Sequence, residues 1–92
     1  MIRHFRCKET KALWETGKSR KFQKVTGIAL RKLQMLNAAD SLEILARVPG
    51  NRFEKLQGKR QDQYSIRIND QWRLCFEFSS AQDFEVEITD YH

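Results

Sequence analysis

The stretch from residue 64 to residue 78 constrains the fold most, because large apolar side chains alternate with polar ones along it. The alternation runs through residues 64–68 and again through residues 72–78, on either side of Asn69-Asp70-Gln71. A period of two is typical of a half-buried strand, and a polar break of this composition is typical of a turn. The stretch therefore predicts a β-hairpin with one apolar face.

The register of this hairpin follows from its pattern. Keeping both apolar sets on one face places Ile68 opposite Trp72, and this brings Arg67 opposite Arg73 on the other face. Like charges directly across a strand pair are unfavourable. Two interpretations stay open: an anion lies between the arginines, or they are a solvated surface pair.

The rest of the chain predicts an α+β fold. The expected order is strand, helix, helix and then four strands, with a further short helix between the long helix and the second strand. The expected elements before the hairpin are a strand over Ile2–Arg6, a helix over Lys8–Glu15 ended by Gly17, a long helix from Ser19 to about Asn37, a short helix over Ser41–Ala46 opened by a capping box of Asp40 and Glu43, and a strand over Phe53–Leu56. A last strand begins near Phe84. This order predicts one domain over residues 1–92, an antiparallel sheet of four to five strands with both N-terminal helices on one face. The opposite face, with Arg67 and Arg73, is then at least partly open.

Composition favours nucleic acid as a partner over a plain soluble protein. The chain of 92 residues has 17 lysines and arginines against 12 acidic residues, a net charge of +5 and a pI near 9.5. Its two cysteines are far apart, with neither metal-ligand spacing nor a disulfide framework, so we predict no metal, no cofactor and a reducing cytoplasm. No apolar run resembles a signal peptide or a membrane span.

A basic ridge is expected along the long helix. No carboxylate occurs between Glu15 and Asp40. The cations expected on the face opposite the apolar one, or beside it, are Arg20, Lys21, Lys24, Arg31 and Lys32. They are either a ridge that contacts RNA phosphates or an ordinary solvated face.

A second cluster is expected at the end of the chain. If the last hairpin is centred on Ala81, Arg73 lies opposite Thr89, and Tyr91 is its diagonal neighbour. Arginine binds phosphate, tyrosine can stack a base and histidine carries protons near neutral pH. With His92, this set suffices for metal-free RNA cleavage by the ribose 2′-hydroxyl. Geometry alone favours a frayed terminus for His92 and leaves Tyr91 undecided.

Four segments carry a resemblance to a known family. They are residues 5–8 (FRCK), 49–58 (PGNRFEKLQG), 63–76 (QYSIRINDQWRLCF) and 87–92 (EITDYH). Together they resemble the HigB toxins, the proteic killer branch of the RelE/ParE superfamily of bacterial toxin–antitoxin systems, over essentially the whole chain.

The resemblance implies a RelE-like fold and a ribosome-dependent mRNA endonuclease acting in the A site. It also implies neutralisation by a HigA-type helix-turn-helix antitoxin, with operator DNA bound only through that antitoxin. Arg73 would stabilise the transition state, Tyr91 would position the RNA and His92 would handle a proton. The general base stays open among Glu54, Tyr91 and His92. Further phosphate contacts are predicted for Arg67, Arg52, Lys55, Lys59 and Arg60.

Two other functions compete with this one. A ParE-like toxin acting on DNA gyrase would share the fold without needing a Tyr-His end or a phosphate-binding arginine. A non-enzymatic basic module would bind RNA or the ribosome without cleaving it.

Overall fold

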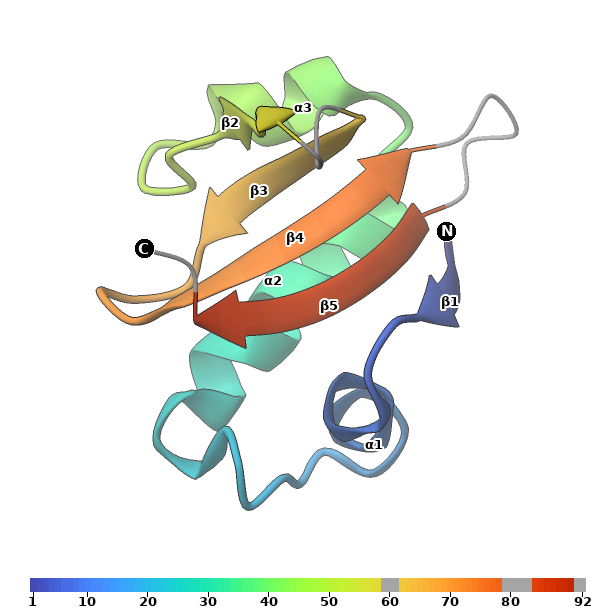
Figure 1. The fold of residues 1–92 in the computed structure, drawn as a ribbon, viewed down its shortest axis with the longest axis vertical. Helices are drawn as coiled ribbons and strands as arrows, with labels where there is room; N and C mark the ends of the chain where they lie inside the picture. Colours follow the sequence, from blue (N-terminus) through green and yellow to red (C-terminus); the bar gives the residue numbers. More distant parts are fainter. Residues whose placement is uncertain (59–61, 79–83, 91–92) are drawn as a thin grey trace.

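A five-stranded sheet packs against two helices in the computed structural model, which describes residues 1–58, 62–78 and 84–90 (Figure 1). The strands lie in the order β1-β5-β4-β3-β2. Their bounds are β1 Ile2–Phe5, β2 Glu54–Lys55, β3 Gln63–Arg67, β4 Trp72–Phe78 and β5 Phe84–Asp90. The helices are α1 Lys8–Thr16, α2 Thr26–Ala38 and α3 Leu42–Arg47, with a 3₁₀ turn η1 at Gln23–Val25. The predicted α+β class is confirmed.

The central hairpin has the predicted register. Arg67 pairs with Arg73, and the Ile68 amide donates to the Trp72 carbonyl at 3.0 Å. The Asn69 side chain closes the turn, because its Oδ1 accepts from the amides of Gln71 at 2.9 Å and Trp72 at 2.6 Å. An Asn at the start of a turn mimics a backbone acceptor in this way.

One edge of the sheet differs from the antiparallel arrangement expected from sequence. β1 runs parallel to β5, so the sheet is mixed. β1 is short and pairs with only the first part of β5, and the chain then turns away into α1. Beyond the end of β1, Thr10 of α1 satisfies the next amide of β5: its buried hydroxyl accepts from the Ile88 amide at 3.0 Å. A longer β1 would have supplied a backbone carbonyl at this place. Pattern alone does not give the direction of a strand whose partner is 80 residues away.

The long helix expected from Ser19 is shorter than predicted. Residues 19–22 are not helical, η1 follows, and α2 begins only at Thr26. Phe22 explains the difference, since its fully buried ring meets Trp72 edge-on at 5.0 Å between centroids. The Ser19 hydroxyl accepts from the Phe22 amide at 3.3 Å, which makes a local turn where a helix cap was expected.

The two short predicted elements are present with adjusted bounds. The N-cap of α3 is Ser41, one residue after the expected Asp40, and its hydroxyl accepts from the Ile44 amide at 3.4 Å. Glu43 does not complete a capping box, because it lies one position too early and approaches Arg47 instead, at 3.7 Å. The strand expected over Phe53–Leu56 is reduced to the two residues of β2.

The helices cover one face of the sheet, as predicted. α2 lies behind β4, and α1 lies beside β1 and β5 (Figure 1). The core between these layers contains Leu33 and Leu36 from α2 and Leu74 and Phe76 from β4, all essentially buried. The other face has no helix on it among the described residues, and it carries Arg67 and Arg73. Within the described ranges, no helix has the length and apolar character to cross a membrane.

Candidate active site

Arg73 projects from the middle strand onto the face without helices. Its Nε donates to the Ser65 hydroxyl at 2.9 Å, and its Nη2 donates to the Arg52 carbonyl at 2.7 Å. The side chain is 13% exposed, less than the sequence suggests for a residue that faces away from the helices. A guanidinium fixed at two nitrogens is preorganised, which is what stabilising a developing charge requires.

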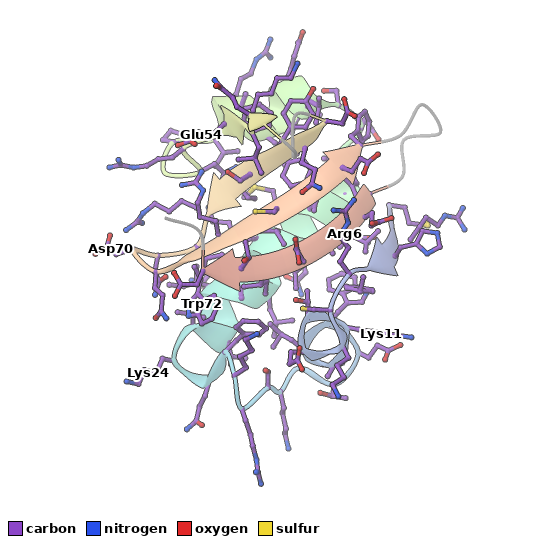
Figure 2. All side chains as sticks on the ribbon, viewed as in Figure 1. Arg6, Lys11, Lys24, Glu54, Asp70 and Trp72 are labelled. Carbon is purple, nitrogen blue, oxygen red and sulfur yellow. The ribbon has the colours of Figure 1, made fainter. Side chains whose placement is uncertain are left out.

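Glu54 is the carboxylate that the structure brings to this guanidinium. It lies on β2, opposite Ser65, and its Oε1 is 3.9 Å from Arg73 Nη2. Its side chain is 58% exposed, so the carboxylate is accessible to a substrate (Figure 2). Arg73 and Glu54 are therefore a cation and a base side by side at one edge of the sheet.

Arg67 and Arg73 bind different groups of the protein. The two residues face each other in the register, but Arg67 pairs with Asp70 of the adjacent turn, while Arg73 points to Ser65 and Arg52. Each arginine thus has its own partner within the protein. A solvated surface pair does not describe Arg73, which is 13% exposed, and the shared anion stays a prediction.

The strand leading to the chain end has the predicted register. Arg73 pairs with Thr89, and Trp72 pairs with Asp90, the last residue of β5. Tyr91 and His92 follow directly but lie outside the described residues, as do Lys59 and Arg60. Their roles stay predictions.

The predicted phosphate-binding residues of β2 are at the surface. Arg52 and Lys55 are both exposed and flank Glu54 in sequence. Lys55 pairs with Tyr64 and Glu54 with Ser65, so on β2 the Lys55 side chain points to the face opposite the Arg73–Glu54 pair.

The basic ridge is assembled differently from the prediction. Arg20 and Lys21 stand on non-helical residues, so no single helix presents the cations. They meet Lys24 at a cavity of about 320 Å³ whose other wall includes Asn69 and Trp72 from the β3–β4 turn. Figure 2 shows Lys24 and Trp72 at the same end of the molecule. Trp72 and Arg73 are neighbours on β4, but their side chains point to opposite faces of the sheet, so this cavity lies on the helix side and Arg73 on the other side.

Lys32 is not part of this surface. It is half-buried, and its Nζ donates to the Asn51 Oδ1. Burial, and then the nearby positive charges of Arg31 and Arg67, lower the pKa of Lys32 below its usual value. Lys32 therefore belongs to an interior hydrogen-bond network, whereas Arg31 is exposed as predicted.

Far from Arg73, the same sheet face is acidic. Glu77 and Glu85 are paired across β4 and β5, and Arg6 bridges them, at 2.9 Å from Glu77 and in direct contact with Glu85. The hydrogen bond to Glu85 raises the pKa of Arg6, with the surrounding carboxylates adding to the effect and burial opposing it. In Figure 2, Arg6 and Glu54 lie over opposite edges of the sheet. The face thus presents its unbalanced positive charge at the Arg73 end.

Sequence reasoning missed two residues of the site. Ser65 could have been found, because the hairpin register puts it on the face of Arg73, two residue pairs along the ladder. Asn51 gave no such signal, since its contacts come from elements distant in sequence.

Comparisons with known proteins identify the family of the chain. The family model that describes a RelE-like toxin of the type II toxin–antitoxin system HigB matches residues 3–92. Toxin HigB-1 of Vibrio cholerae is 35% identical over 80 residues, which cover 85% of this chain and 84% of that protein.

Two solved structures share the fold. The YoeB–YefM toxin–antitoxin heterotetramer of Staphylococcus aureus contains a chain with a TM-score of 0.63 and 22% identity, over 100% of this chain and 95% of that one. The YoeB/ParE toxin of Agrobacterium tumefaciens has a TM-score of 0.60 and 20% identity, over 100% of both chains.

Proposed function

The chain belongs to the HigB family of RelE-like toxins of type II toxin–antitoxin systems, and on that premise we propose that it is a ribosome-dependent endoribonuclease. It cleaves mRNA in the A site and so inhibits translation. The observation that carries the proposal is the Arg73 guanidinium, held by Ser65 and the Arg52 carbonyl with the Glu54 carboxylate 3.9 Å away.

The reaction needs three roles and no metal. Glu54 removes the proton from a ribose 2′-hydroxyl, and the 2′-oxygen attacks the adjacent phosphorus. Arg73 binds the phosphorane oxygens, whose negative charge grows in the transition state. The bond from phosphorus to the 5′-oxygen breaks, and His92 gives that oxygen its proton. The products are a 2′,3′-cyclic phosphate and a 5′-hydroxyl. Tyr91 positions the RNA.

The ribosome supplies alignment that this small site lacks. The described groups that contact Arg73 come from β3 and β2, on one side of the sheet. A flexible mRNA would seldom place its 2′-oxygen in line with the phosphorus and the leaving 5′-oxygen at such a site. An mRNA held in the A site presents the scissile phosphate in a fixed geometry, and such positioning accounts for several kcal/mol of a barrier. The cations at the cavity beside Trp72 contact ribosomal RNA phosphates in this proposal.

The partner that controls the toxin is a cognate helix-turn-helix antitoxin. Support comes from family membership and from the neighbour solved as a toxin–antitoxin complex. Operator DNA is bound only through that antitoxin. The place of action is the cytoplasm, where ribosomes translate.

A direct test compares two substrates. The purified chain is mixed with naked mRNA and with the same mRNA on programmed 70S ribosomes, and the ends of the fragments are mapped. We expect cleavage on ribosomes only, with cyclic phosphate and 5′-hydroxyl ends. Efficient cleavage of naked mRNA would contradict ribosome dependence, and inhibition of gyrase supercoiling without RNA cleavage would favour a ParE-like toxin.

A further inference from the structure

Asn51 is a buried polar residue that connects three elements. Its side chain is completely buried; Nδ2 donates to the Leu45 carbonyl of α3 at 2.9 Å, and Oδ1 accepts from Lys32 of α2. Its backbone carbonyl accepts from the Arg67 amide of β3 at 2.6 Å, and its amide donates to the Val48 carbonyl at 3.2 Å. Hydrogen bonds on every polar group fix both the side chain and the backbone of this residue.

The next residue, Arg52, has an unusual backbone. Its φ is +46°, the left-handed conformation, and among the described residues it is the one non-glycine with a positive φ. Such a conformation is unfavourable for a side chain with a Cβ, so it persists only where the surroundings impose it. On the N-terminal side of Arg52, the constraint comes from Asn51, which is held by four hydrogen bonds.

The conformation of Arg52 decides where its carbonyl points. That carbonyl accepts from Arg73 Nη2 at 2.7 Å, and with Ser65 it sets the plane of the guanidinium. If residues 51–52 relaxed to a right-handed conformation, the carbonyl would rotate away and Arg73 would keep only the bond to Ser65.

We propose that Asn51 is a positioning residue for Arg73: by holding Arg52 in the left-handed conformation, it orients the guanidinium toward the scissile phosphate. Asn51 itself is buried and touches no substrate. The proposal rests on the proposed function for its effect on cleavage, but the orientation of Arg73 can be measured without any ribosome.

The first test is the NMR signal of the Arg73 side-chain Nε–H group, assigned by its loss in Arg73→Lys. Asn51→Asp keeps the acceptor for Lys32 but loses the donor to Leu45. It should shift this signal and speed its exchange with water. It should also lower the maximal single-turnover rate on programmed ribosomes about tenfold, with half-saturation unchanged, because misplacement affects the chemical step more than binding. If Asn51→Asp does not fold, Asn51→Ser takes its place.

The matched control is Asn37→Asp. Asn37 also has its Oδ1 bonded to the protein, accepting from the Ile2 amide at 2.9 Å, but it is remote from Arg52. This variant should leave both the Arg73 signal and the maximal rate unchanged.

A rescue separates positioning from general damage. Glycine adopts a positive φ without strain, so in Arg52→Gly the carbonyl of residue 52 should keep its direction even when Asn51 is altered. The shift and the rate loss caused by Asn51→Asp should therefore be smaller in an Arg52→Gly background. Two results would overturn the proposal: a folded Asn51 variant whose Arg73 signal is unmoved, or a rate loss from Asn51→Asp that is equal with Arg52 and with Arg52→Gly. If the parent protein cleaves no mRNA on programmed ribosomes, the proposed function fails instead, while the NMR signal continues to test the positioning.

Discussion

Replacing Arg73 by alanine should damage both folding and cleavage. A strand residue that faces away from the helices is expected from sequence to be dispensable for the fold. The structure gives a different expectation, because the Arg73 side chain is 13% exposed and bonded to Ser65, whose side chain is completely buried. Hydrogen bonds from charged donors contribute about 1.5–3 kcal/mol each, and a buried partner left unsatisfied costs about 1–3 kcal/mol.

These terms overlap, so Arg73→Ala should lower the free energy of unfolding by about 2–3 kcal/mol. For a domain of this size, each kcal/mol shifts Tm by about 4–8 °C, and the variant should melt some 10–20 °C lower. Arg73→Lys keeps the charge but loses the planar arrangement of N–H donors. Its Tm should therefore lie between those of the parent and of Arg73→Ala.

The rate should fall further than stability alone explains. Removing one preorganised donor costs about 3–4 kcal/mol of transition-state stabilisation in other enzymes, a factor of about 10²–10³. The assay is single-turnover cleavage on programmed ribosomes, at a temperature where melting curves show every variant folded.

Two results would refute this reasoning. A folded Arg73→Ala protein that cleaves within tenfold of the parent rate would remove Arg73 from the chemistry. An unchanged Tm would mean that its hydrogen bonds do not hold the sheet edge together. Arg67→Ala is the matched control, because Arg67 pairs with the fully exposed Asp70. That variant should melt like the parent and weaken RNA binding without lowering the maximal rate.

Four other predictions follow from the same contacts. Lys24→Glu, alone and with Arg31→Glu, should weaken ribosome binding, and each lost phosphate contact should reduce the slope of log affinity against log salt by about 0.7–0.9. Lys11→Glu, on α1, is the control for the single reversal, and an unchanged slope in both ridge variants would mark a solvated face (Figure 2). Folding lowers the pKa of Lys32 below 10.5, so between the folded-state pKa and 10.5 the unfolded chain binds more protons than the folded one, and stability should rise with pH. Lys32→Met should remove this rise in Tm, and the control Lys24→Met should keep it. Arg52→Gly should melt about 4–8 °C above Arg52→Ala, since the left-handed backbone costs alanine about 1 kcal/mol, and equal melting would show no strain there. Glu54→Gln should slow cleavage by about 10²-fold or more with Tm unchanged, and a loss below tenfold would move the base to Tyr91 or His92.

Much of the fold could be predicted because its signals are local. The alternation around Asn69 fixed the hairpin, and a period of two leaves one register that keeps the apolar residues together. That register placed Arg73 opposite Arg67, and a last hairpin centred on Ala81 placed it opposite Thr89, both as observed. The end of α1 at Gly17 was likewise visible, since a helix end is satisfied by its immediate neighbours, and the start of α3 was predicted to within one residue.

Contacts between distant segments were decided only by the tertiary structure. The parallel pairing of β1 with β5, the late start of α2 around buried Phe22 and the interior place of Lys32 all depend on partners far away in sequence. The site divides in the same way. The sequence by itself determined that Arg73 is on the face away from the helices, because side chains alternate along a strand. The enclosure of its guanidinium by Ser65, Glu54 and the Arg52 carbonyl required the packing of β2 and the Asn51 network, which no local pattern encodes.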